Sequence, residues 1–199
     1  MQHESNKPIE FGKKWAILSC PRSGTMYTAA FFGAAGFRFS HEALGKNGGC
    51  GWPLILLDLS SCDTIFHQVR HPKDCISRLG RGWDARTQKY MDGGIAPDTW
   101  TYKVPGVGRG VEFWVRWNTM CEKKALLTFR VEDLLPKSPL LQRISDILEF
   151  PEIEFRDIPT NANTTGNKTK VSRDEVSRHC PQFVEQAFQM AEKYGYVWE

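Results

Sequence analysis

The chain has 199 residues, of which 41% are hydrophobic and 25% charged, and this length and composition predict a single globular domain over residues 1–199 rather than a disordered chain. Its net charge is only +3, from 26 Lys and Arg against 23 Asp and Glu, which excludes a general nucleic-acid binder and suits a local pocket for a small anion. No apolar run approaches the roughly 18 residues that span a bilayer and no signal peptide is recognisable, so we expect a cytoplasmic protein with no membrane span.

Apolar runs typical of strands alternate with segments of helical periodicity. The predicted strands are Lys14–Ser19, Gly36–Ser40, Thr64–Val69 and Leu126–Arg130. Helices are predicted from a turn at residues 20–24 to about residue 35, and over residues 73–81, 110–124, 138–149 and 181–194, with loops at 84–108 and 156–171. Because strands that alternate with helices form βαβ units, we expect an α/β fold with three layers, a mostly parallel sheet with helices on both faces.

The segment Cys20-Pro21-Arg22-Ser23-Gly24-Thr25-Met26-Tyr27 lies between the first strand and the first helix. A turn at this position aims backbone N–H groups and the positive end of the helix dipole at one point, which favours an oxyanion. Gly24 allows close approach of the backbone, Ser23 and Thr25 offer hydroxyl groups, and Arg22 adds a fixed positive charge. The turn is therefore predicted to bind an anion.

Two anion-binding motifs do not fit this turn. A Walker A loop needs G-x-x-x-x-G-K-S/T, whose first glycine and Lys-Ser/Thr pair are missing here. A cysteine phosphatase resembles this turn in its cysteine but carries an arginine six residues later, where this chain has Met26. The turn instead resembles that of the sulfotransferases, roughly P-K/R-S/A-G-T/S-T/S, which holds the 5′-phosphosulfate of 3′-phosphoadenosine-5′-phosphosulfate (PAPS). The resemblance implies that the nucleotide contacts Pro21, Arg22, Ser23, Gly24, Thr25, Met26 and Tyr27.

A second block supports the resemblance, because the strand Thr64–Val69 runs into Arg70-His71-Pro72-Lys73-Asp74. It is similar to the sulfotransferase pattern R-N/D/H-P-R/K/L-D-x-x-x-S, whose arginine and serine clamp the 3′-phosphate of the nucleotide. The serine of the family falls eight residues after the arginine, where this chain has Arg78, whereas Ser77 comes one residue earlier. Ser77 and Arg78 thus both stay candidates for the 3′-phosphate beside Arg70, and a simple ion pair of Arg70 with Asp74 is the alternative interpretation.

The third block, residues 127–134, resembles the strand of the family that ends in E-D-L. Many members have a tyrosine before E-D that contacts adenine, but this chain has Val131, so stacking on Tyr27 is the substitute that we expect. The pair Glu132-Asp133 is predicted to cap the following helix. The family's late R-K-G segment is not recognisable, and Lys168 is the residue there that could supply a cation to the nucleotide.

These three blocks cover residues 14–150 and imply a P-loop NTPase-like sulfotransferase fold. The implied reaction transfers a sulfuryl group from PAPS to a hydroxyl or amine of a small-molecule or carbohydrate acceptor, leaving 3′,5′-ADP and requiring no metal. Arg22 is expected to stabilise the leaving nucleotide. The base is expected to be either His41 or Glu42. His41 is favoured because imidazole changes charge near neutral pH, and Glu42 is favoured because some family members have a glutamate base at this position.

Two other functions stay open from the sequence. A P-loop kinase is suggested by residues 54–58, an apolar run ending in Asp58 that resembles a Walker B strand. A non-catalytic nucleotide-binding protein with the same fold is the other. Among the remaining residues, Trp114 and Trp117 are expected in the core because of their i, i+3 spacing, and His67 is expected to pack within the sheet. The six cysteines show neither metal-ligand spacing nor the density of a disulfide scaffold, so reduced thiols are expected.

Overall fold

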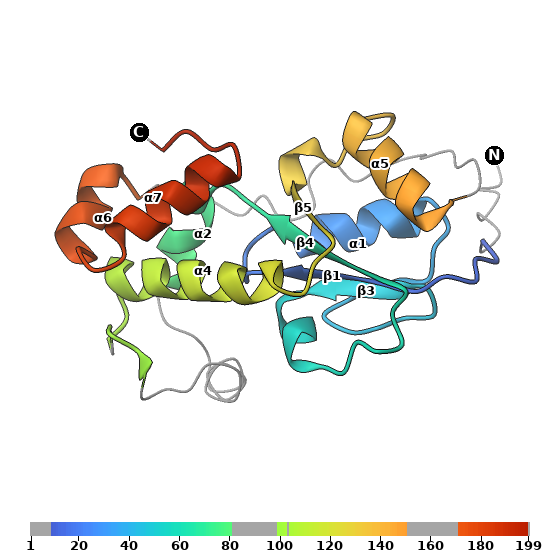
Figure 1. Ribbon diagram of the computed structural model, residues 1–199, viewed down its shortest axis with the longest axis horizontal. Coiled ribbons are helices and arrows are strands. Elements are labelled where there is room, and N and C mark those ends of the chain that lie inside the picture. Colours follow the sequence, from blue (N-terminus) through green and yellow to red (C-terminus); the bar gives the residue numbers. More distant parts are fainter. Residues whose placement is uncertain (1–8, 81–98, 103, 151–170, 199) are drawn as a thin grey trace, which may run out of the picture.

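A computed structural model describes residues 9–80, 99–102, 104–150 and 171–198. In this part of the chain, five strands form one all-parallel sheet in the order β2-β3-β1-β4-β5, and helices pack on both of its faces (Figure 1). The fold is α/β and consistent with three layers. The elements are, in chain order, β1 (Trp15–Ser19), α1 (Thr25–Ala34), β2 (Phe39–His41), β3 (Gly48–Gly51), the 3₁₀ helix η1 (Trp52–Leu56), β4 (Thr64–Val69), α2 (Pro72–Leu79), α4 (Val107–Glu122), β5 (Leu127–Arg130), the 3₁₀ helix η3 (Val131–Asp133), α5 (Pro139–Leu148), α6 (Arg173–His179) and α7 (Val184–Lys193).

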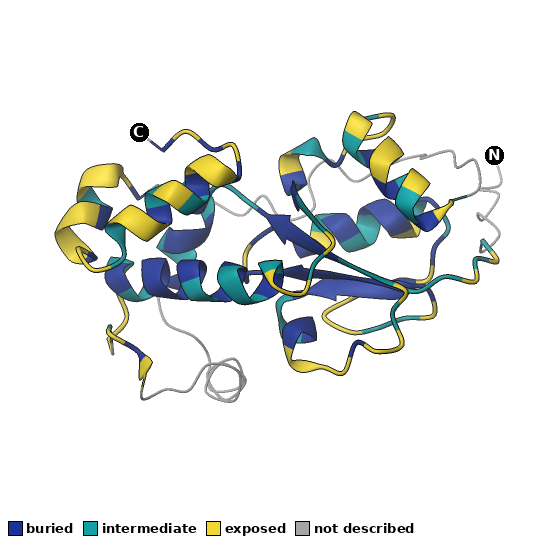
Figure 2. Cartoon of the chain, viewed as in Figure 1, coloured by how far each residue is buried: buried dark blue, intermediate teal, exposed yellow. Residues whose placement is uncertain are grey.

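Alternate residues of β1 belong to two separate cores, one on each face of the sheet. Trp15 and Ile17 pack with apolar residues of α1 and α5, whereas Ala16 and Leu18 pack with α2, α4 and η1. All five residues of β1 are buried, as expected for a central parallel strand that is covered on both faces. Figure 2 shows the central strands β1 and β3 buried throughout, while α5, α6 and α7 keep one exposed face.

The strand register places the loops that carry the predicted motifs at one edge of the sheet. Ser19 of β1 pairs with Gln68 of β4, and Val69 of β4 pairs with Arg130 of β5. Because all strands are parallel, the turn after β1 and the segment after β4 leave the same edge from adjacent strands. The helix after β1 covers one face and the helix after β4 covers the other, and ligands of open parallel sheets bind where neighbouring connections diverge in this way.

The sheet differs from the sequence-based prediction in its first half. The predicted strand at residues 36–40 is shorter and later, at Phe39–His41. The strand β3 was not predicted at all, because its sequence, Gly-Gly-Cys-Gly, has almost no side chains from which to read an alternation. It nevertheless lies between β1 and β2 and completes the sheet. Residues 54–58 are not a strand, since they form the end of η1 and the turn after it.

The predicted helices are confirmed with shifted ends, and within the described ranges the α-helix α6 was missed. The segment 110–124 begins three residues earlier, in α4, and 181–194 is confined to Val184–Lys193. The helix α6 was not predicted, although Ser172 and Glu175 form a reciprocal capping box at its start. Glu132 and Asp133 do not cap α5, which begins instead with Ser138, whose hydroxyl accepts from the Leu141 N–H.

The core predictions for single residues are confirmed where the structure tests them. Trp114, Trp117 and His67 are all fully buried. The six cysteines are free, and five of them are buried. Of the helices in the described ranges, none combines the length and the apolar character needed to cross a bilayer.

Candidate functional site

The turn between β1 and α1 contains two residues in the left-handed backbone conformation. Gly24 adopts the left-handed conformation with φ 87°, and Arg22, which is not a glycine, does so with φ 71°. Left-handed backbone at a residue with a side chain is uncommon and concentrates at functional sites. No side chain caps α1, so the first N–H groups of this helix point towards the turn without an acceptor from a capping residue.

A buried hydroxyl group in the turn lacks a nitrogen or oxygen partner among the described residues. The Ser23 side chain is fully buried beside the Cys75 thiol, a weak hydrogen-bonding group, and its Oγ has no other hydrogen-bond partner among the described residues. An unsatisfied buried hydroxyl costs about 1–3 kcal/mol, so such groups are rare unless a water or a ligand satisfies them. Beside the uncapped helix start, this hydroxyl is a donor suited to an oxyanion.

Gln68 of β4 fixes the turn to the sheet, and the sequence analysis missed it. Its side-chain amide donates from Nε2 to the Ser23 carbonyl oxygen at 2.6 Å, and its Oε1 accepts from the Thr28 hydroxyl of α1. Gln68 is fully buried, and a second polar residue next to His67 at the buried end of β4 was the available signal. The amide thus links β4, the turn and α1 in one network.

Arg70 lies next to the turn, as the shared sheet edge predicts. The thiol sulfur of Cys75 lies 3.7 Å from the Arg22 carbonyl oxygen and 4.0 Å from the Arg70 carbonyl oxygen. The Arg70 guanidinium is 3.7 Å from Asp74 Oδ2, so the ion pair that was the alternative interpretation does exist. That distance exceeds normal hydrogen-bond length, and the pair therefore orients the guanidinium without using up its donors.

The Arg22 side chain carries a charge that is more exposed than that of Arg70. This side chain is exposed, and it forms no ion pair or side-chain hydrogen bond within the described ranges.

The thiols of Cys20 and Cys75, close to the turn, are fully buried. Burial raises the pKa of both thiols, that of Cys75 to about 12. These thiols stay protonated at neutral pH, which argues against thiolate chemistry in this turn.

His41 and Glu42 both lie at the same edge, at the end of β2. His41 Nε2 is 3.0 Å from the hydroxyl oxygen of Thr25, the first residue of α1. Glu42, in a left-handed conformation with φ 56°, accepts from the Trp52 indole N–H at 2.8 Å. The imidazole therefore borders the start of α1 directly, while the carboxylate is held by an aromatic residue of η1.

The two residues expected around adenine are already engaged within the protein. The Tyr27 ring is half-buried beside Phe31, and its hydroxyl donates to the Leu134 carbonyl oxygen at 2.8 Å. Burial raises the pKa of Tyr27. Val131 packs over the turn, since a Cβ at Gly24 would lie 3.2 Å from its Cγ2. Stacking of adenine on Tyr27 stays a prediction.

The other predicted residues are placed as follows. Pro21 is buried and Met26 exposed. Ser77 and Arg78 are half-buried and lie one helical turn after Asp74 on α2. Lys168 lies outside the described residues.

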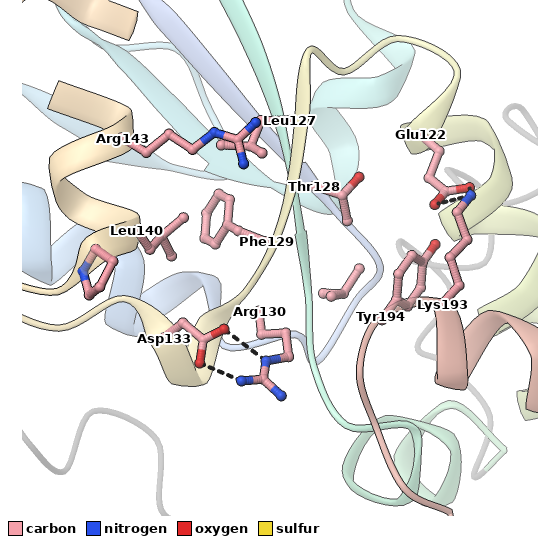
Figure 3. A pocket seen from close by; sticks show the side chains of 12 residues that line it. Glu122, Leu127, Thr128, Phe129, Arg130, Asp133, Leu140, Arg143, Lys193 and Tyr194 are labelled. Carbon is pink, nitrogen blue, oxygen red and sulfur yellow. Dashed lines mark hydrogen bonds and ion pairs between the residues drawn. The ribbon is translucent and has the colours of Figure 1, made fainter. Parts of the chain in front are cut away.

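Two clefts lie beside this edge rather than at the turn itself. One, of about 580 Å³, runs along the outer strand β5 between α5 and α7 and contains the ion pairs Arg130–Asp133 and Glu122–Lys193 (Figure 3). The other, of about 380 Å³, adjoins Arg70 and is lined by His71, Lys73, Asp74, Arg130, Glu132 and Tyr196. Neither cleft includes Arg22 or Arg70, and the described residues hold no cluster of three or more His, Cys, Asp or Glu side chains arranged for a metal ion.

Comparisons with protein-family models, with curated proteins and with solved structures find no match for this chain. No relative therefore supplies a role for any residue of the site.

Proposed function

We propose that this protein is a cytoplasmic sulfotransferase with a P-loop NTPase-like fold, which transfers a sulfuryl group from PAPS to a small-molecule or carbohydrate acceptor. One observation carries the proposal: Arg22 and Arg70, predicted from separate motifs, follow adjacent strands, and their carbonyl oxygens both lie within 4.0 Å of the Cys75 sulfur. Two cationic segments so close at one edge suit a ligand with two anionic groups.

The residues present fit the two ends of such a donor. The turn offers the helix N-terminus, the buried Ser23 hydroxyl and the exposed Arg22 charge to a phosphosulfate. Arg70, held loosely by Asp74, keeps donors for a 3′-phosphate. In sulfuryl transfer, negative charge develops on the leaving nucleotide, and Arg22 is the group we assign to stabilise it.

His41 is our choice for the base that takes the proton from the acceptor. Its Nε2 lies beside Thr25 at the start of α1, where the transferred group would sit, whereas the Glu42 carboxylate is occupied by the Trp52 N–H. A base must lie within hydrogen-bond reach of the proton it removes, and only the imidazole borders the turn. Glu42 then acts by holding Trp52 in place.

The kinase alternative loses its sequence support in the fold. Residues 54–58 belong to η1 and the turn after it, and Asp58 Oδ1 accepts from the Ser60 N–H at 2.9 Å. This carboxylate thus closes a local turn and does not end a strand of the sheet. The other alternative, a non-catalytic nucleotide-binding protein, is distinguished from a sulfotransferase by the experiment that follows.

The experiment compares thermal stabilisation by 3′,5′-ADP, 5′-AMP and ATP with magnesium. At about 100 times its dissociation constant, 3′,5′-ADP should raise the free energy of unfolding by about 2.7 kcal/mol and the melting temperature by roughly 5–10 °C. Arg22→Ala and Arg70→Ala should lose most of this shift, and Arg143→Ala, which removes an exposed arginine of α5, should keep it. A larger shift with ATP and magnesium would contradict the proposal in favour of a kinase. Binding of 3′,5′-ADP without its release from PAPS across a broad acceptor panel would indicate a binding protein.

A further inference from the structure

The C-terminal segment Gly195–Trp198 crosses the ends of β4 and β5, next to Arg70. The Arg130 guanidinium donates from Nη1 to the Gly195 carbonyl oxygen at 3.1 Å, and it lies 5.7 Å from the centre of the Tyr196 ring. The Tyr196 hydroxyl donates to Glu132 Oε2 at 2.8 Å. The segment therefore joins the strand that precedes Val131 to the C-terminus.

This segment is anchored firmly at its far end. Trp198 is 6% exposed, its indole N–H donates to the Val171 carbonyl oxygen at 3.1 Å, and its ring packs edge-on against Phe188 at 4.9 Å. A segment held by a buried tryptophan has a fixed position. It can therefore transmit that position to the residues it contacts.

His71 is the link between this segment and the start of α2. Its Nδ1 accepts from the Lys73 N–H at 3.2 Å and so caps the helix, and its other ring nitrogen, Nε2, lies 3.1 Å from the Val197 carbonyl oxygen. Because Nδ1 accepts, the ring proton must be on Nε2, which then donates to Val197. The Tyr196 ring packs against the imidazole at 4.9 Å. The C-terminal segment thus fixes both the tautomer and the orientation of the capping residue.

The position of Arg70 depends on this cap. Arg70 directly precedes His71, and its guanidinium is oriented by Asp74, which lies in the first turn of α2. That contact is long, at 3.7 Å, so a small displacement of the first turn would move the guanidinium. Orientation by a neighbouring group is a common way to hold a charged ligand-binding residue.

We propose that the C-terminal segment Gly195–Trp198 positions Arg70 for the 3′-phosphate of the nucleotide, through His71 and Tyr196. This inference rests on the proposed function. His71 and Tyr196 are positioning residues and do not themselves touch the nucleotide.

The test measures the ratio of the affinities for 3′,5′-ADP and 5′-AMP by titration calorimetry, because this ratio isolates the contribution of the 3′-phosphate. His71→Ala should lower the ratio about tenfold, which is the loss of one hydrogen bond to a charged group. Tyr196→Leu, which leaves the cap of α2 intact, should lower it about threefold. The affinity for 5′-AMP should stay within about twofold of that of the unmodified protein.

Two controls separate positioning from stability. Ile144→Val, in the core on the opposite face of the sheet, should lower the free energy of unfolding by about 0.5–1.5 kcal/mol and leave the ratio unchanged. In an Arg70→Ala background, His71→Ala should cause no further loss of the ratio, since both act through one contact. The inference alone would be overturned if neither His71→Ala nor Tyr196→Leu changed the affinity ratio. It would also be overturned if His71→Ala lowered the ratio about tenfold in the Arg70→Ala background. Absence of any 3′-phosphate effect in the unmodified protein would overturn the proposed function, and the inference with it.

Discussion

His67 and Gln68 are neighbours on β4 that point to opposite faces of the sheet. Gln68 bonds the turn and α1, whereas His67 contacts Asn118 of α4 at 3.0 Å and Thr128 of β5 at 3.2 Å. Both side chains are fully buried. The sequence predicted burial for His67, but it could not indicate that Gln68 reaches the turn between β1 and α1, because that contact joins residues 45 positions apart.

The buried His67 makes stability depend on pH. Burial lowers its pKa to about 4, from about 6.5 in an unfolded chain. Between these values the unfolded state binds the proton and the folded state does not, so the free energy of unfolding falls as the pH drops from about 6.5 towards 4. The full loss from this group is about 3 kcal/mol.

Replacing His67 with Gln should remove most of this pH dependence. Urea denaturation at pH 5 and at pH 7.5 measures the difference for both proteins. An equal drop in the variant and in the unmodified protein would show that other groups carry the effect.

Replacement of His41 should lower the turnover of PAPS more than replacement of Glu42. His41→Gln should lower turnover of PAPS by about 10²–10⁴, the usual contribution of a general base, with 3′,5′-ADP affinity nearly unchanged. Glu42→Gln keeps a carbonyl oxygen for the Trp52 N–H and should cost less than about tenfold. Release of 3′,5′-ADP over an acceptor panel measures both. The reverse order would assign the base to Glu42.

At the scale of single elements, β3 shows why a strand without side chains escapes sequence analysis. A Cβ at Gly49 would overlap the Ala43 carbonyl oxygen. Glycine is therefore required where the loop after β2 folds back against the strand. The alternation of side chains that marks other strands is missing, and only the partners β1 and β2 define β3.

Alanine substitutions at two glycines should have opposite effects on stability. Gly49→Ala should lower the free energy of unfolding by at least about 3 kcal/mol, since the backbone must move to admit the methyl group. Gly33→Ala, in α1 with open space around its Cα, should raise it by about 0.5–1 kcal/mol, because alanine favours helix. Urea denaturation compares the two. A stable Gly49→Ala protein would show that the fold around β3 differs from the one described.

At the scale of the whole molecule, α4 joins the helical layer to the centre of the sheet. Trp117 donates from Nε1 to the carbonyl oxygen of Ser19, the last residue of β1, at 3.0 Å. Its ring stacks on Phe113 at 4.9 Å. Trp114 is equally buried, but its Nε1 has no hydrogen-bond partner within the described ranges. One tryptophan thus binds the layers by a hydrogen bond and the other by packing alone.

Conversion of each tryptophan to Phe should separate these contributions. Trp117→Phe leaves the Ser19 carbonyl oxygen without this donor and should destabilise the protein by about 1 kcal/mol more than Trp114→Phe, the net value of one hydrogen bond. Chemical denaturation of the two variants gives the difference. Equal losses would mean that the indole N–H of Trp117 contributes nothing net.

The sequence by itself determined the class of fold, the strands β1, β4 and β5, the core tryptophans and the position of the turn between β1 and α1. These features depend on local patterns, namely periodicity, glycine positions and the chemistry of residues close along the chain. The tertiary structure decided the rest: the insertion of β3, the role of Gln68, the contact of His41 with Thr25 and the contact of the C-terminal segment with His71. Each of these joins residues distant in sequence, and only the parallel register and the packing of layers bring such residues together.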